Sequence, residues 1–136
     1  MMETLIPLPY RIADTSRLHY AETGISPHSE TERVRWTVPS NCYGKLQHAY
    51  LRVRRATAAS TGGTVRARIE VLHDGTTVNY VLEVRMVDNT VNATQFQVLG
   101  LEIWMLPGDA VRIVTSDDST GGTIDYFAYV NYALVV

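Results

Sequence analysis

The chain has 136 residues, of which 46% are hydrophobic and 19% are charged, and its formal net charge is -2. This composition excludes a disordered or fibrous chain and predicts one globular domain, since a single hydrophobic core is enough at this length. The near-neutral charge provides no overall positive field for nucleic acid. The single cysteine, Cys42, excludes an intrachain disulfide, and we interpret it as a small buried filler.

The first part of the chain, residues 1–29, contains three of the five prolines and shows little regular alternation. We interpret it as an N-terminal arm with one short strand. The arm either lies on a neighbouring subunit through Leu5, Ile6, Leu8 and Tyr10 or is a flexible terminus. Because the start of the chain resembles no signal peptide and no stretch approaches the roughly 18 apolar residues of a membrane span, we expect synthesis in a cytoplasm and no membrane partner.

From residue 30 to residue 136 the side chains alternate with a period of two, which predicts the strands of an antiparallel β-sandwich domain. The first two strands of this region place apolar residues on one face and arginines on the other. The apolar faces contain Val34, Trp36 and Val38, and then Ala49, Leu51 and Val53. The opposite faces and the following strand carry Arg33, Arg35, Arg52, Arg54, Arg66 and Arg68.

These arginines suggest a basic stripe, but few aromatic residues lie between them, whereas single-strand nucleic-acid modules stack bases on several exposed rings. Salt bridges to nearby glutamates explain the arginines more simply, so we expect no nucleic-acid partner. Eleven of the twelve basic residues are arginine. Protein interfaces favour arginine, although solvated strand faces give the same composition.

A hairpin is predicted around Asp74 and Gly75, the dipeptide that most favours a two-residue turn. In that register the pairs are Val71 with Val78, Ile69 with Tyr80, Ala67 with Leu82, Val65 with Val84, and Arg66 with Glu83. Each apolar residue meets another, and a slip of one residue would destroy this agreement.

Further strands are predicted at 94–105, 110–115 and 123–136, and the last of them is apolar on both faces. One face has Ile124, Tyr126, Ala128, Val130, Tyr132 and Leu134, and the other has Phe127, Tyr129, Ala133 and Val135. In a two-layer sandwich one face of a strand normally meets water, so the second needs cover from the arm, from loops of the same chain or from another subunit. We take another subunit as the simplest cover and predict a homo-oligomer. Its interface is assigned to Tyr126, Phe127, Tyr129, Tyr132 and Val135.

The sequence also contains an internal echo, since residues 60–65 (STGGTV) recur as residues 119–124 (STGGTI). Each copy opens a strand. The echo indicates similar turns at equivalent places in the two sheets, or it reflects turn composition alone.

Residues 101–113 (LEIWMLPGDAVRI), a loop and then the aromatic strand around residues 126–129 resemble the closing strands of trimeric jelly rolls of the tumour-necrosis-factor and complement-head superfamily. With the WTVP motif at residues 36–39 and the TSDDSTGG turn at residues 115–122, the chain resembles the jelly-roll virion proteins of tailed bacteriophages more. This resemblance implies a virion structural protein, a trimeric capsid decoration or head-fibre protein that binds the major capsid or another virion protein. It also leaves open a tail or receptor-binding component.

No catalytic or metal-binding constellation is evident. His19, His28, His48 and His73 are scattered, whereas a metal-dependent jelly-roll enzyme needs histidines one strand-step apart and a carboxylate. Asp117 and the aspartate after it could bind calcium, but a solvated turn explains them as well. We therefore expect no cofactor, no metal and no enzymatic activity.

Two other functions remain as alternatives. A carbohydrate-recognition module would use Trp104, Tyr43 or Tyr50 as a stacking platform. The second alternative is a metal-dependent enzyme with the same jelly-roll fold.

Overall fold

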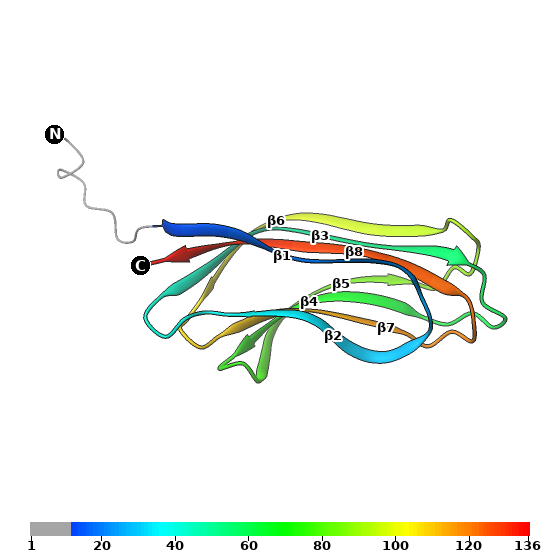
Figure 1. Ribbon diagram of the computed structural model, residues 1–136, viewed down its shortest axis with the longest axis horizontal. Helices are drawn as coiled ribbons and strands as arrows, with labels where there is room; N and C mark the ends of the chain where they lie inside the picture. Colours follow the sequence, from blue (N-terminus) through cyan, green and yellow to red (C-terminus); the bar gives the residue numbers. More distant parts are fainter. Residues whose placement is uncertain (1–11) are drawn as a thin grey trace.

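A computed structural model describes residues 12–136 and shows an all-β fold in that part of the chain (Figure 1). No helix among these residues is long and apolar enough to cross a membrane. The strands are β1 (Ile12–Ile25), β2 (His28–Thr37), β3 (Tyr43–Thr57), β4 (Val65–His73), β5 (Thr77–Met86), β6 (Thr94–Met105), β7 (Ala110–Asp117) and β8 (Thr123–Val135).

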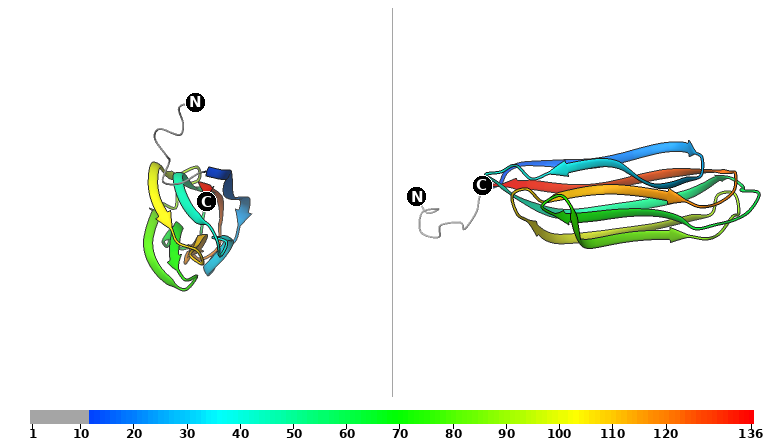
Figure 2. Two further views of the ribbon diagram at one scale, coloured as in Figure 1. Left: turned by 90° about the vertical axis from the view of Figure 1, so that its left-hand side faces the viewer. Right: turned by 90° about the horizontal axis from the view of Figure 1, so that it is seen from below.

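The strands form two antiparallel four-stranded sheets that pack face to face (Figures 1 and 2). Sheet A has the order β1-β8-β3-β6 and sheet B has the order β2-β7-β4-β5. Only β4 and β5 are joined as a hairpin within one sheet, while every other connection crosses from one sheet to the other. This is the double Greek-key arrangement of an eight-stranded jelly roll, so the predicted jelly-roll-like β-sandwich is confirmed.

The sandwich begins earlier than the sequence predicted. Residues 12–25 form β1, which pairs with β8 from Ile12 opposite Val135 to Ile25 opposite Ile124. The expected division at residue 29 is therefore wrong, because β1 is a full-length edge strand of sheet A and not a short strand within an arm. The arm residues expected to make contacts, Leu5, Ile6, Leu8 and Tyr10, lie outside the described residues.

The β4–β5 hairpin has the predicted faces but a different register. Its turn has three residues instead of two, with His73 opposite Thr77, and β5 contains one extra residue, Asn79, because Val71 opposes Tyr80 while Leu72 opposes Val78. The observed pairs are Val65 with Met86, Ala67 with Val84, Ile69 with Leu82 and Arg68, in place of Arg66, with Glu83. The two irregularities shift the register by an even number of residues. The side chains from Tyr80 onward therefore stay on their predicted faces. Val78 lies between the two irregularities, so it changes face: it is opposite Leu72 instead of Val71 and is 42% exposed.

The core between the sheets contains the apolar faces that the alternation predicted. Leu51, Val53, Ile69 and Ile113 are completely buried there. At the end of the sandwich where the described chain starts and ends, Trp36 of β2 stacks on Tyr132 of β8 with ring centroids 3.9 Å apart. Gly44 of β3 lies against the same indole, since a Cβ atom at Gly44 would be 3.0 Å from Trp36 Cζ3.

The two echoed segments lie side by side at the opposite end. Thr61 in the β3–β4 connection and Thr120 in the β7–β8 connection form an antiparallel bridge, in which the Thr120 amide donates to the Thr61 carbonyl at 2.9 Å. Both connections cross between the sheets, so the two segments are not hairpins within a sheet, although they pair with each other at one end of the sandwich. Gly122 has a φ of 73°, and a Cβ atom there would lie 2.7 Å from the Ala59 amide nitrogen. Only glycine fits this close approach without strain.

Candidate functional site

The outer face of sheet A, the side turned away from sheet B, carries aromatic side chains on all four strands. We call this surface the aromatic face. Its rings belong to His19 of β1, Tyr43, His48 and Tyr50 of β3, Phe96 and Trp104 of β6, and Phe127 and Tyr129 of β8. Alternation within each strand places these residues opposite the core positions. The face therefore extends over the whole width of the sheet.

The central rings of the aromatic face contact one another. Tyr129 stacks on Tyr50 with centroids 5.7 Å apart and on His48 at 5.6 Å, and Tyr50 also stacks on Phe96 at 6.4 Å. Phe127 meets both Tyr50 and Tyr129 edge to face. Because the flat sides of these rings are turned toward neighbouring rings, the side chains stand beside one another and support a rigid surface.

Two arginines lie over this ring cluster. The guanidinium carbon of Arg17 is 4.0 Å from the Tyr129 ring centroid, and Arg17 Nε donates a hydrogen bond to the Asn131 side chain at 2.9 Å. The guanidinium carbon of Arg52 is 5.5 Å from the Phe127 centroid. Cation–π contact holds both cations on the aromatic face. Aromatic rings with arginine are the composition that protein interfaces favour.

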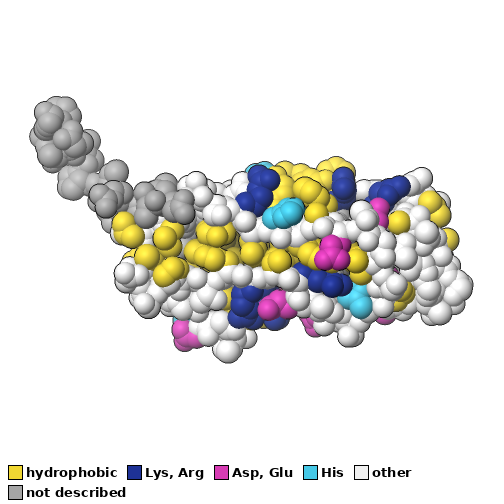
Figure 3. Space-filling model, in the orientation of Figure 1, with side chains coloured by type: hydrophobic (Ala, Val, Ile, Leu, Met, Phe, Trp, Pro, Cys, Tyr) yellow, Lys and Arg dark blue, Asp and Glu magenta, His cyan; other side chains and the backbone are white. Residues whose placement is uncertain are grey.

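The rim of the aromatic face is open to solvent. Phe96 is 64% exposed, Val98 is 49% exposed and Trp104 is 46% exposed. Of the residues that the structure describes, none form a third layer over sheet A. Figure 3 shows hydrophobic side chains gathered beside basic and histidine side chains over the upper strands of the molecule. This surface has the apolar and cationic character of an interaction site.

The outer face of sheet B is chemically different because its charges are paired with one another. Arg68 contacts Glu83 and Glu30 at 2.7 Å each, and Arg112 contacts the buried Glu70 at 2.7 Å. Arg68 is hydrogen-bonded to Glu83, which lowers the pKa of that carboxyl although partial burial opposes the change. This face is closed by internal ion pairs and offers little unpaired charge to a partner.

The predicted basic stripe does not exist as one surface. Arg52 and Arg54 lie on the outer face of sheet A, while Arg35 and Arg68 lie on sheet B, on the other side of the molecule. Arg33 does not share the outer face with Arg35, since a β-bulge in β2 turns it inward.

No protein-family model matches the chain, and the comparison with curated proteins finds no match. Solved structures share its fold at low identity. Dimeric latent PorU from Porphyromonas gingivalis has a TM-score of 0.50 and 12% identity over 89% of this chain and 12% of that chain. The VP2 subviral particle of infectious bursal disease virus has a TM-score of 0.46 and 12% identity over 93% of this chain and 32% of that chain. A CocE/NonD family hydrolase from Staphylococcus aureus has a TM-score of 0.41 and 10% identity over 93% of this chain and 33% of that chain.

The chain therefore spans a third or less of each of these proteins. At 12% identity the similarity to PorU concerns the fold alone and not a function.

The structure separates the five residues that the sequence assigned to an oligomer interface. Phe127 and Tyr129 lie half-buried on the aromatic face, where a partner could reach them. Tyr126 lies in the sandwich core. Tyr132, on the same face of β8, is partly buried and stacks on Trp36 at the edge of the core, and Val135, on the opposite face, is completely buried. The assignment combined residues from both faces of β8. Tyr126 and Tyr132 lie on the face turned toward the core, whereas Val135 shares the outer face with Phe127 and Tyr129.

The carbohydrate-platform residues also differ in their surroundings. Trp104 and Tyr43 are about half-exposed near one end of the aromatic face, and Lys45 Nζ lies 5.3 Å from the Trp104 ring centroid. Tyr50 is stacked between Phe96 and Tyr129. A sugar stacks on the flat side of a ring, so Tyr50 is poorly placed for that role.

The sequence analysis missed a polar cluster inside the sandwich. Arg55 of β3 is completely buried, and its Nη2 donates to Ser119 Oγ at 3.2 Å. The buried carboxylate of Asp117 accepts the Ser119 amide hydrogen at 2.9 Å, and the phenols of Tyr20 and Tyr126 are buried nearby. Burial first, and then the charge of Asp117, raises the pKa of the Tyr126 phenol.

The polar cluster continues toward β2. Arg33 Nε and His28 Nε2 both hydrogen-bond to the buried Thr115 hydroxyl, at 2.9 Å and 2.8 Å, and Arg33 lies 5.3 Å from the Tyr20 ring centroid. The sequence could have indicated the buried position of Arg55, because Arg55 follows the core residue Val53 by two residues and therefore lies on the same face of β3. The inward turn of Arg33 depends on a bulge that nothing in the sequence indicates.

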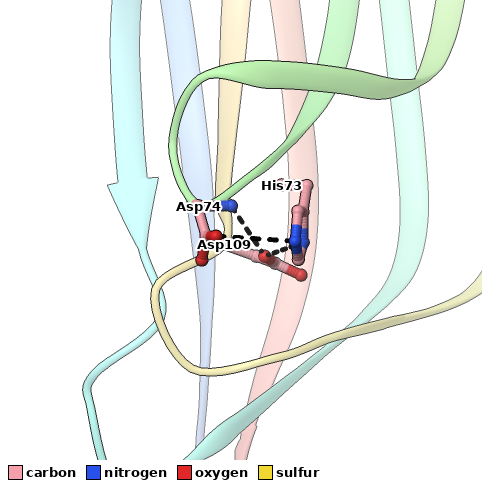
Figure 4. Close-up of side chains that lie close together, drawn as sticks. All are labelled: His73, Asp74 and Asp109. Carbon is pink, nitrogen blue, oxygen red and sulfur yellow. Dashed lines mark hydrogen bonds and ion pairs between the residues drawn. The ribbon is translucent and has the colours of Figure 1, made fainter.

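A second polar group lies at the tip of the β4–β5 hairpin (Figure 4), where the side chains of His73, Asp74 and Asp109 come within 4.8 Å of one another. His73 Nδ1 is 3.1 Å from Asp109 Oδ1. However, Asp109 also accepts the backbone amide hydrogens of Asp74 at 3.1 Å and Leu106 at 2.9 Å. Both carboxylate oxygens of Asp109 are thus already bonded, Oδ1 to the hairpin turn and Oδ2 to the backbone of its own loop, and the arrangement is explained as a structural cap.

The acidic turn at Asp117 and Asp118 has a similar role. Asp118 Oδ1 accepts the Thr64 amide hydrogen at 2.6 Å, and Asp117 Oδ1 accepts that of Ser119. Both carboxylates cap backbone groups of the connections between the sheets. Gly63 makes this contact possible, since a Cβ atom there would lie 2.3 Å from Asp118 Oδ1.

Proposed function

We propose that the protein is a virion structural protein that assembles as a homo-oligomer through the aromatic face and does not act by catalysis. The observation that carries the proposal is the extent of this face, a ring cluster with arginines and a solvent-exposed rim across four strands. A monomer in water would have to leave these rings hydrated. A second protein surface would remove them from water.

The size of the face supports a protein partner. Four strands about 4.8 Å apart and about 12 residues long, at about 3.3 Å per residue, give a surface of about 750 Å². A standard protein interface buries about 800 Å² on each partner. The face is therefore large enough for a stable contact without any other surface.

The finer parts of the proposal rest on the jelly-roll order of the strands and on the turn motifs shared with phage virion proteins. Jelly rolls are common in viral coat proteins, although lectins and enzymes use them as well. We propose a trimeric capsid decoration or head-fibre protein of a tailed bacteriophage. It would assemble in the host cytoplasm and bind the major capsid or another virion protein.

The assembly is tested by sedimentation velocity on the native protein and two variants. Tyr129→Glu puts a charge in the centre of the aromatic face and should shift the protein to monomer. Val81→Glu is the matched control, because Val81 is 47% exposed on the outer face of sheet B, and it should sediment like the native protein. A native protein that is monomeric at micromolar concentration overturns the proposal. For the virion role, mass spectrometry of purified particles should find the protein in stoichiometric amounts, and its absence would refute that part.

A carbohydrate-recognition module in a tail or receptor-binding protein is the second candidate. Trp104 and Tyr43 favour it, because both are about half-exposed at the same end of the aromatic face. Glycan-array binding that is lost in Trp104→Ala but kept in Phe127→Ala would support this function. Binding to no glycan would exclude it in favour of the structural role.

A further inference from the structure

β6 is an edge strand of sheet A, and it is unusually poorly protected. Among residues 12–136 its only hydrogen-bonded neighbour is β3, so the backbone groups on its other side have no strand partner there. Of its twelve residues, only Glu102 is charged. Exposed edges of this type are templates for pairing with another chain unless charges, prolines or bulges block them.

The three other edge strands of the sandwich do have such protection. β1 has two register irregularities, at its start and near Glu22, and β2 has two more together with several charged side chains. β5 is kinked by the extra residue Asn79 and carries Glu83 and Arg85, which pair with each other at 3.1 Å. β6 has one irregularity and one charge, both between Gly100 and Ile103, so its longer part, Thr94–Gly100, is the unprotected edge among the four strands.

The segment Thr94–Gly100 is the regular part of β6. It pairs with β3 without interruption from Thr94 opposite Arg54 to Gly100 opposite His48, and it contains neither a charge nor a proline. Phe96 and Val98 on its outer side belong to the exposed rim of the aromatic face. Seven regularly paired, uncharged residues are long enough for a further strand to pair along them.

We propose that β6 pairs antiparallel with β6 of a second copy of this chain about a two-fold axis at Gln97, which joins two copies of sheet A into one eight-stranded sheet. In this register Phe96 faces Val98 of the other copy on the outer side, and Gln95 faces Leu99 on the inner side. An aromatic ring opposite a β-branched residue is a favourable cross-strand pair.

A second copy is the occupant that best fits this edge. A strand placed antiparallel to itself always meets an identical edge, so the contact is self-complementary and closes at two copies. The pairing also makes the aromatic faces of the two copies continuous through Phe96 and Val98. The edge contact is separate from the contact through the centre of the aromatic face in the proposed function, and either can exist without the other.

Disulfide trapping tests the pairing and its register. In Gln97→Cys the two introduced cysteines are directly opposite each other, with Cβ atoms about 4.5–5.5 Å apart, which a small adjustment brings within disulfide distance. In the control Gln95→Cys they are offset by four residues, about 14 Å along the strand. The native Cys42 is the only cysteine of the chain and is buried, so it does not interfere.

Under mild oxidation at micromolar concentration we expect Gln97→Cys to form a covalent dimer as the main species on non-reducing gels, while Gln95→Cys stays largely monomeric. No dimer with Gln97→Cys, or equal dimer with both variants, overturns the proposal. Combining Gln97→Cys with Tyr129→Glu separates the two contacts. If the pair of changes still gives the covalent dimer, the edge contact stands even where the assembly through the aromatic face has failed.

Discussion

Replacing Gly44 by alanine should destabilise the protein although alanine is normally the better residue in a strand. Gly44 faces the core, and an added methyl group would lie 3.0 Å from Trp36 Cζ3 and 3.0 Å from Val38 Cγ2. Ordinary contacts between carbon atoms are about 3.5–4.0 Å. The indole cannot simply retreat, because Tyr132 stacks against it with ring centroids 3.9 Å apart.

The magnitude follows from two opposing effects. Overpacking a closed core position costs about 1–3 kcal/mol. Alanine recovers about 0.5–1 kcal/mol, since glycine loses more chain entropy on folding. The net loss of unfolding free energy is therefore about 1–2 kcal/mol, which for a domain of this size lowers the Tm by about 3–8 °C.

Thermal and urea unfolding followed by circular dichroism measure this loss. Gly100→Ala is the matched control, because no atom lies within 4 Å of its added Cβ, and it should be neutral or slightly stabilising. In a Trp36→Leu background, Gly44→Ala should destabilise clearly less, since the ring is gone and only the close approach to Val38 remains. If Gly44→Ala is as stable as the native protein, the indole is not clamped and the reasoning is wrong.

Three further predictions concern buried and paired charges. Arg55→Met should lower the unfolding free energy by about 3 kcal/mol in urea titrations, because it leaves the Asp117 carboxylate buried beside fewer positive charges, and adding Asp117→Asn should recover part of the loss. The pKa of Glu83 is lowered in the folded protein. Its contribution to stability is therefore fully present above its unfolded pKa of about 4.3 and is lost as the pH falls through the folded pKa. The difference in Tm between the native protein and Glu83→Gln should vanish in that acid range. Asp109→Ala should cost about 2 kcal/mol by leaving two loop amides unpaired, while a chelator should leave the Tm of the native protein unchanged; a chelator effect would instead indicate a bound metal.

The faces of the strands were predictable, because the period of two follows directly from strand geometry. Leu51, Val53 and Ile69 lie in the core as expected. The register of the β4–β5 hairpin was not predictable in detail, since the three-residue turn and the extra Asn79 depend on how the strands twist against their neighbours. Beyond Asn79 the shift is even, so the faces were predicted correctly there and only the opposing pairs were wrong, while Val78 changed face.

The aromatic face was half-predictable. The outward position of Phe127 and Tyr129 follows from alternation, and so does the need for cover. The contributions of His19 and Phe96 come from strands far apart in sequence, and only the jelly-roll order brings them to one surface. β1 was underestimated because its outer side is mostly polar, as an edge strand permits, so its alternation is weak in the sequence.

The central position of β8 in sheet A affects how the protein can fold during its synthesis. β8 is synthesised after the other seven described strands, yet it lies between β1 and β3 and pairs with both, since Val130 is opposite Leu18 on one side and Ala49 on the other. Until β8 emerges from the ribosome, β1 and β3 have no strand to pair with between them, and their apolar side chains stay exposed to water. Sheet A can therefore be completed only after translation of the last strand, which makes slow folding and early recruitment of chaperones the natural expectation for this topology.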